Sequence, residues 1–243
     1  MSQRSSKTKR IAAIRQLVGL LQDALPRVRL VDKSEMPRFV SALGLARAVR
    51  LLEAMLLMND NDLRDVAALP LRPLFEVWLT AMYCFLGGDA ALIELQGAHR
   101  RQVSQIPSKA LQRALDRVAS EDIEMKRVQW EQLAQKVGRL AAEQGDFGAE
   151  DRIQQFYDFV YRGESLASIH GGIGTVGGHA RLIAGNKLMI RPKRADAKSS
   201  IEPIVVGGVL VAMLASHLLN AYDLDDGRFD AIAKVITREP RRG

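Results

Sequence analysis

"LRPLFEVWLTAMYCFLGG", residues 71–88, is the stretch of sequence from which the fold can be read. It is apolar on nearly every side of a helix, which is typical of a helix surrounded by other elements in a core. We therefore predict a central helix that begins near Pro73 and ends at Gly87 and Gly88. Its polar residues follow one face at spacings of four, four and three positions: Arg72, Glu76, Thr80 and Tyr83.

Apolar residues recur at helical spacing through most of the remaining chain. Residues 11–25 form one amphipathic helix that Pro26 ends, and a second helix starts at Ser34 and runs to about Met58. Further helices are predicted at 89–105, 108–119, 122–144, 149–162, 165–170, 201–222 and 226–237. The pattern predicts an all-α protein, a single multi-helix bundle with a glycine-rich loop before the last long helix.

The glycine-rich segment 171–200 interrupts this pattern, and two short apolar runs within 181–191 indicate a hairpin. The segment also contains a G-x-G-x-x-G motif at Gly172, Gly174 and Gly177. A dinucleotide-binding loop must follow a strand and open a helix, whereas these glycines follow a helical segment and precede the predicted hairpin. We interpret them as a connection and not as a phosphate-binding loop.

Length and composition favour one globular domain. The chain has 243 residues, 47% of them apolar, which is enough for a large core. We predict a helical domain over residues 11–237, between a basic disordered tail at 1–10 and a basic tail at 238–243. The single Cys84 and the absence of a secretion signal favour a cytoplasmic protein. No cysteine cluster or H-E-x-x-H motif is present, so we expect neither a metal nor a cofactor.

The positive charge is concentrated in a few segments. Of the net charge of +7, the two tails supply six units, and residues 181–198 carry five more. The remaining body is therefore negative. The cations of the loop that we predict to contact a nucleic-acid substrate are Arg181, Lys187, Arg191, Lys193 and Arg194. A solvated basic surface without a ligand remains the alternative.

The apolar run 204–219 is shorter than the roughly 20 residues that a membrane span needs. It also contains Gly207, Gly208, Ser216 and His217. A buried helix that packs closely through its small residues is the favoured interpretation, with attachment to a membrane as the minor alternative.

Two polar clusters are candidates for a functional site. Arg72 and Glu76 stand on the apolar helix, either as a structural ion pair or as part of a polar pocket between helices. The second cluster surrounds the predicted helix that ends at His170, a residue suited to acid–base chemistry near neutral pH or to a simple capping role. Its members are Tyr157, Tyr161, Arg162, Glu164, Ser165, Ser168 and His170.

The segments "RPLFE" (72–76) and "YRGESLASIHGG" (161–172) give the chain a layout that resembles an uncharacterised family of helical bacterial proteins, distantly similar to HEPN domains. Active HEPN proteins are metal-independent ribonucleases of toxin and phage-defence systems. The resemblance implies Arg72, Glu76, Ser165 and His170 as a site. Arg162 and His170 have seven residues between them, a wider spacing than that of the family.

The leading hypothesis is an RNA-acting protein. In it His170 is the acid–base group, Arg162 or Arg72 stabilises phosphate charge beside Glu76, and Tyr161 and Ser165 help to bind substrate. The alternative is a non-enzymatic helical module that binds a partner protein, a second copy or a small ligand. The sequence leaves open whether the protein is catalytic at all.

Overall fold

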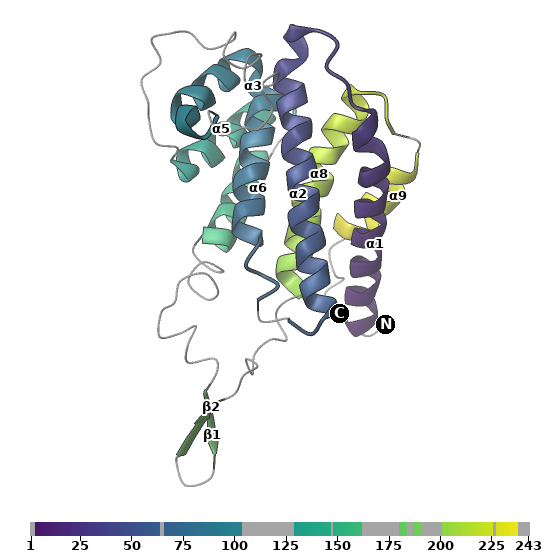
Figure 1. Cartoon of the computed structure of the whole chain (residues 1–243), viewed down its shortest axis with the longest axis vertical. Helices are drawn as coiled ribbons and strands as arrows, with labels where there is room; N and C mark the ends of the chain where they lie inside the picture. Colours follow the sequence, from purple (N-terminus) through teal and green to yellow (C-terminus); the bar gives the residue numbers. More distant parts are fainter. Residues whose placement is uncertain are drawn as a thin grey trace.

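The computed structural model describes residues 3–63, 66–103, 129–146, 148–161, 180–183, 187–190, 201–225 and 227–237. The long helices α1 (Gln3–Ala24), α2 (Met36–Asp60), α3 (Leu71–Val103) and α8 (Ile201–Ala221) run alongside one another, together with the shorter α9 (Arg228–Thr237) (Figure 1). Two further helices, α5 (Trp130–Glu143) and α6 (Ala149–Tyr157), pack on each other, and α5 also packs on α3. The predicted all-α bundle is confirmed.

Local sequence explains where the first two helices meet. Helix α1 stops before a 3-10 turn, Leu25–Arg27, that contains Pro26. A second 3-10 turn, Lys33–Glu35, leads into α2, and the Asp32 side chain caps it by accepting a 2.8 Å hydrogen bond from the backbone N–H of Ser34. The predicted start at Ser34 is therefore correct to within two residues.

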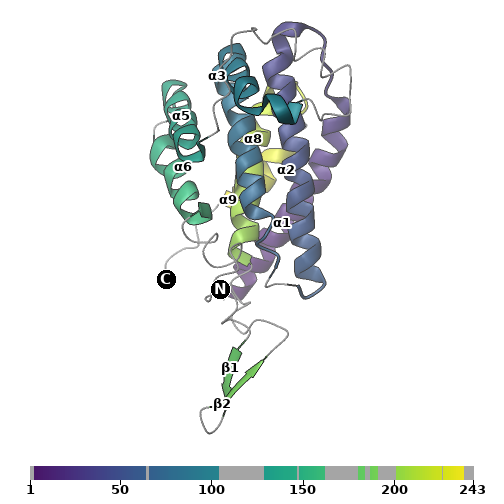
Figure 2. The ribbon, with the colours of Figure 1, turned by 60° about the vertical axis from the view of Figure 1, so that its left-hand side comes forward.

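Helix α3 occupies the centre that its sequence predicts. Phe75 and Trp78 are completely buried, and their rings stack with centroids 5.8 Å apart. Helices α2, α5 and α8 all contact α3, and Figure 2 shows α5 and α6 as a separate pair beside it. A helix that is apolar all round is stable only when it is enclosed in this way.

The predicted end of α3 at Gly87 and Gly88 is wrong. The helix continues to Val103, although Gly88 has a φ of 59°, in the left-handed region. A left-handed residue changes the course of a right-handed helix, and glycine adopts this conformation without strain. The residues that follow carry a second buried face, including Ala91 and Leu92, and burial of that face favours continuation of the helix.

Two other predicted boundaries also differ from the structure. Residues 3–10 form the first turns of α1, where the sequence predicted a disordered tail, and they contain good helix formers without glycine or proline. Helix α5 begins at Trp130 and not near residue 122. The helix predicted at 108–119 and the C-terminal tail at 238–243 lie outside the described residues.

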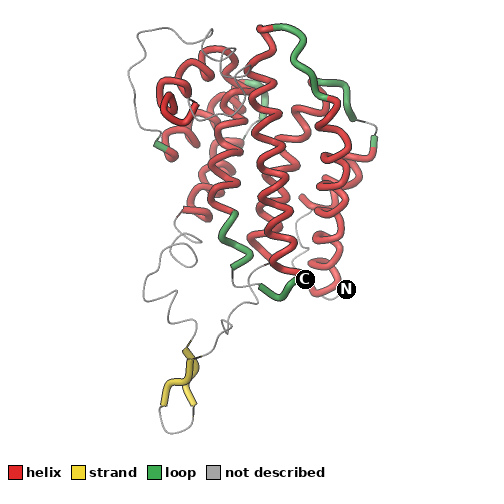
Figure 3. Tube along the Cα trace, in the orientation of Figure 1, coloured by secondary structure: helices red, strands yellow, loops and turns green. Residues whose placement is uncertain are grey.

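The predicted hairpin is confirmed. Strands β1 (Ala180–Ile183) and β2 (Lys187–Ile190) are antiparallel, with Ala180 opposite Ile190 and Ile183 opposite Lys187. Figure 3 shows this ribbon, in yellow, beyond one end of the helices. It is the only sheet within the part of the chain that the structure describes.

Helices α3 and α8 are also long and apolar enough to cross a membrane, over Leu71–Gln96 and Pro203–Ala221. In their most apolar windows, 44% and 56% of the residues are buried within the protein. The central helices of a helical bundle have the same composition, so length and hydropathy alone do not distinguish the two settings.

Small residues allow the central helices to approach closely. A Cβ atom on Gly44 of α2 would lie 2.7 Å from the Cβ atom of Ala81 on α3. Next to this contact, the buried Ser41 hydroxyl lies 2.8 Å from both the Pro37 and the Ala81 carbonyl oxygens. A Cβ atom on Gly208 of α8 would lie equally close to Ile14 of α1. Close packing through glycine, predicted for α8, therefore also holds α2 against α3.

We expect Gly44→Ala to destabilise the protein by about 1–3 kcal/mol, because the new methyl group forces α2 and α3 apart. Gly19→Ala is the matched control, since a Cβ atom on Gly19 would have nothing within 4 Å. It should stabilise the protein by roughly 0.5–1 kcal/mol, the usual gain of alanine over glycine in a helix. Urea unfolding at equilibrium measures both, and equal stability of the two variants would contradict the close contact.

Candidate functional site

Arg72 and Glu76 lie in the first two turns of α3 and form an ion pair along the helix. Nε of Arg72 lies 3.1 Å from Oε1 of Glu76, the geometry of an i, i+4 pair. The two side chains are 29% and 26% exposed. The sequence predicted a mostly buried pair bonded to another helix. Both side chains are indeed mostly covered, and the bond to another helix comes from Tyr161.

Tyr161 joins this pair from a distant part of the chain. It is the last residue of a π-helical turn, residues 158–161, that follows α6. Its hydroxyl donates a hydrogen bond to Oε1 of Glu76, and the guanidinium carbon of Arg72 lies 4.6 Å from the centre of its ring. Arg72, Glu76 and Tyr161, all predicted site residues, therefore form one cluster, which we call the Arg72 triad. Glu76 and Tyr161 are 85 positions apart in the sequence.

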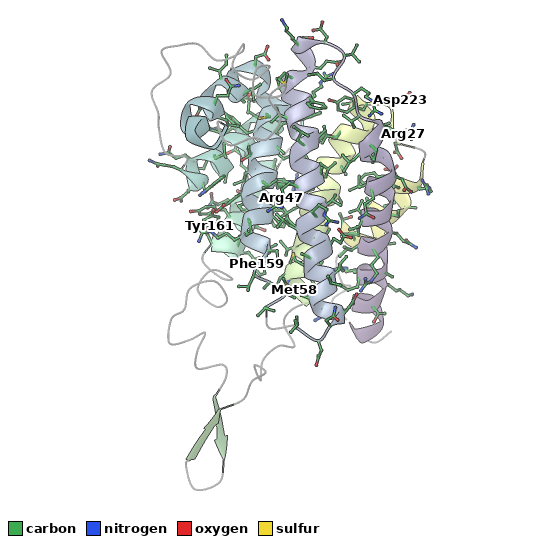
Figure 4. All side chains as sticks on the ribbon, in the orientation of Figure 1. Arg27, Arg47, Met58, Phe159, Tyr161 and Asp223 are labelled. Atoms are coloured by element: carbon green, nitrogen blue, oxygen red, sulfur yellow. The ribbon has the colours of Figure 1, made fainter. Side chains whose placement is uncertain are left out.

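Aromatic rings extend the Arg72 triad on both sides. The ring of Tyr157 stacks on that of Tyr161, with centroids 4.8 Å apart and planes 15° apart, and Phe75 presents an edge contact at 6.3 Å. Figure 4 labels Tyr161 on the side of the bundle near α6. Tyr157 was noted in the polar cluster but not selected as a site residue, and its signal in the sequence is the spacing of four from Tyr161.

The triad fixes the charge state of its members at neutral pH. Burial raises the pKa of Tyr161 well above its usual value, and the hydrogen bond to Glu76 and its negative charge raise it further, against the opposing effect of Arg72. Burial lowers the pKa of Arg72, but the bonds to Glu76 and Tyr161 outweigh it, so the net shift is upward. Tyr161 is thus a neutral hydrogen-bond donor and Arg72 a cation.

The polar face of α3 divides into two clusters. Thr80 donates to the backbone oxygen of Glu76 at 2.9 Å, so it belongs to the helix around the triad. Tyr83 instead donates to Oε2 of Glu94 at 2.7 Å, and Lys136 of α5 pairs with the same carboxylate and lies 5.6 Å from the Tyr83 ring centre. This Lys136 triad repeats the arrangement of tyrosine, carboxylate and cation. Burial and the bond to Glu94 raise the pKa of Tyr83 well above its usual value.

The other predicted site residues are not part of the described geometry. His170, Arg162, Ser165, Arg191, Lys193 and Arg194 lie outside the described residues. Arg181 lies on β1 opposite Met189, and Lys187 lies on β2 opposite Ile183.

Cys84 and His217 behave as core residues, as predicted. Burial raises the pKa of the Cys84 thiol to about 12, so the thiol is unreactive at neutral pH. His217 lies against Phe85, with ring centroids 5.2 Å apart, and burial lowers its pKa although the charge of Asp146 acts in the opposite direction. Among the described residues, no three histidine, cysteine, aspartate or glutamate side chains gather as a metal site would require.

No family model matches this sequence, and neither a curated protein nor a solved structure is detectably similar to it. The findings therefore establish an all-helical fold and identify no family.

We expect Tyr161→Phe to lower the free energy of unfolding by about 1–2 kcal/mol, because it removes the hydrogen bond to a charged carboxylate but keeps the ring. The matched control is Tyr222→Phe, because the buried hydroxyl of Tyr222 has no hydrogen-bond partner in the part of the chain that the structure describes. That change should be neutral or slightly stabilising. Denaturant unfolding of both variants is the measurement, and an equal response would show that the Tyr161 hydroxyl contributes nothing.

The raised tyrosine pKa values also predict a pH dependence. In the unfolded chain a tyrosine loses its proton near pH 10, whereas the folded protein holds the Tyr161 proton to higher pH. The contribution of Tyr161 to stability is therefore complete below about pH 10 and is lost as the pH rises above it, at about 1.4 kcal/mol per pH unit. Unfolding at pH 9, 10 and 11 should show a steeper decline for the wild type than for Tyr161→Phe. Parallel curves would contradict this.

Proposed function

We propose that this protein acts on RNA at the Arg72 triad, as a metal-independent endoribonuclease of the kind found in toxin or phage-defence systems. The observation that carries the proposal is the contact of Tyr161 with Arg72 and Glu76. These residues belong to two segments that the sequence analysis assigned to one site. The chain continues from Tyr161 directly into Arg162, Ser165 and His170.

Each part of the triad suits a ribonucleotide. A guanidinium binds the oxygens of a phosphate through its N–H groups, and a cation near the reacting phosphate stabilises charge that develops in the transition state. Stacked tyrosines offer a flat surface for an unpaired base, as in many single-strand RNA sites. The partial exposure of Arg72 and Glu76 leaves room for such an approach.

The cleavage step needs no metal. The 2′-oxygen of the ribose gives up its proton to a base and attacks the phosphorus, and the bond to the 5′-oxygen breaks. That oxygen takes a proton from an acid, which leaves a 2′,3′-cyclic phosphate and a 5′-hydroxyl. In this scheme His170 exchanges the proton, and Arg72 or Arg162 faces the phosphate.

A non-enzymatic module that binds a partner protein is the second candidate. Glu76 already neutralises Arg72 within the triad, which is the arrangement expected of a purely structural pair. Three leucines at the end of α2 and in the connection to α3 are also exposed, Leu57 at 62%, Leu63 at 49% and Leu69 at 40%. Exposed apolar side chains mark protein interfaces where they form a contiguous patch.

The test is incubation of the purified protein with labelled single-stranded RNA in the presence of EDTA. The wild type should yield products with cyclic phosphate ends, and His170→Ala should abolish cleavage while the melting temperature stays nearly unchanged. Tyr222→Phe is the control and should cleave normally. If the wild type neither binds nor cleaves RNA and His170→Ala only lowers the melting temperature, the enzyme proposal fails and the binding module replaces it.

A further inference from the structure

The first turns of α1 carry an unusual concentration of positive charge. Arg4, Lys7, Lys9 and Arg10 lie within eight residues that contain no acidic side chain. The amino end of a helix bears a partial positive charge that favours acids in its first turn, and α1 has none there. Preferences at helix ends therefore do not account for this run of cations, and departures of this kind tend to occur at functional sites.

Three of these cations are not used within the fold. Lys7 and Arg10 are half-buried and Lys9 is exposed. The ion pairs formed among the described residues join other cations to carboxylates, for example Arg15 to Asp60. None of those pairs includes Lys7, Lys9 or Arg10.

The tertiary structure places this charge at one end of the bundle. In Figures 1 and 2 the start of α1, the end of α2, and the starts of α3 and α8 lie at the same end, which we call the N-terminal pole. Arg72 is the second residue of α3, so the triad also lies toward this pole. The opposite end holds the connections from α1 to α2 and from α8 to α9, where Figure 4 labels Arg27 and Asp223.

The β1–β2 hairpin lies beyond the same pole in both views. In the sequence, residues 181–198 carry six cations against one acid. Apart from this segment and the two tails, the rest of the chain has a net negative charge. The start of α1 and the hairpin, about 170 residues apart in the sequence, thus lie at the same end of the protein.

We infer that the N-terminal pole binds the phosphate backbone of RNA through Lys7, Lys9 and Arg10. The inference rests on the proposed function, since it concerns the same RNA that the Arg72 triad receives. Contacts of this kind are independent of base sequence, and they hold the strand while a separate site reads or cuts it. Lysine and arginine on an exposed helix suit a flexible strand, because their long side chains follow the phosphates.

The experiment compares two triple variants with equal loss of charge. One is Lys7→Gln, Lys9→Gln and Arg10→Gln at the N-terminal pole. The matched control is Arg27→Gln, Lys33→Gln and Arg38→Gln, three exposed cations at the opposite end. The affinity for a labelled single-stranded RNA is measured by fluorescence anisotropy between 50 and 300 mM salt, and melting curves check that both variants are folded.

Three phosphate contacts contribute about two units to the slope of log K against log salt concentration for a single strand. The pole variant should lose about that much slope and bind more than tenfold more weakly at low salt. The control should bind nearly as the wild type does. If RNA binding weakens equally in both variants, net charge alone explains the effect and the inference is overturned. Unchanged RNA binding by the pole variant would also overturn it.

Failure of the inference can be told apart from failure of the proposed function. If RNA binding persists in the pole variant and cleavage still requires His170, only the surface assignment is wrong. If the wild type does not bind RNA but binds vesicles that contain phosphatidylserine, and the pole variant does not bind them, the partner is a lipid surface. Both proposals are then overturned.

Discussion

The rest of the structure depends on the burial of α3. The first half of α3 is apolar on most of its circumference and must be covered there, and α2, α5 and α8 provide that cover. The requirement is strict enough that Trp78 is fully buried although its indole N–H has no hydrogen-bond partner among the described residues. The gain from burying a large aromatic ring exceeds the cost of one unsatisfied donor, which is about 1–3 kcal/mol.

The few polar groups on α3 lie where it meets the α5–α6 pair. The Arg72 triad links α3 to the turn after α6, and the Lys136 triad links it to α5. Apolar contacts tolerate sliding between helices, whereas a tyrosine hydroxyl bonded to a carboxylate has a defined length and direction. The two triads therefore set the position of this pair on α3, and one of them provides the chemistry on which the proposed function rests.

In the proposed function, the Arg72 triad and the N-terminal pole divide two tasks of RNA recognition. Lys7, Lys9 and Arg10 would attract any strand through charge, and salt would weaken their contribution. Arg72 is held by Glu76 and by the ring of Tyr161, so it can present a fixed cation. Attraction of a strand does not require ordered side chains, whereas precise positioning of a phosphate requires a side chain that is held in place. In the proposal, the residues for these two tasks lie in different parts of the N-terminal pole.

Hydrophobic periodicity and capping residues determined the all-α class, the central place of α3 and the starts of α2 and α3, because these depend on residues close together in the sequence. The hairpin and the Arg72–Glu76 pair were readable for the same reason. The continuation of α3 beyond Gly88 could not be predicted from the sequence, because burial of a second apolar face outweighs the tendency of glycine to end a helix. Nor did the sequence contain the contact between Glu76 and Tyr161, which needs α6 to be packed beside α3. Only the tertiary structure brings together groups that are 85 positions apart, and only it brings the starts of α1, α3 and α8 to one pole, because both depend on how the helices pack.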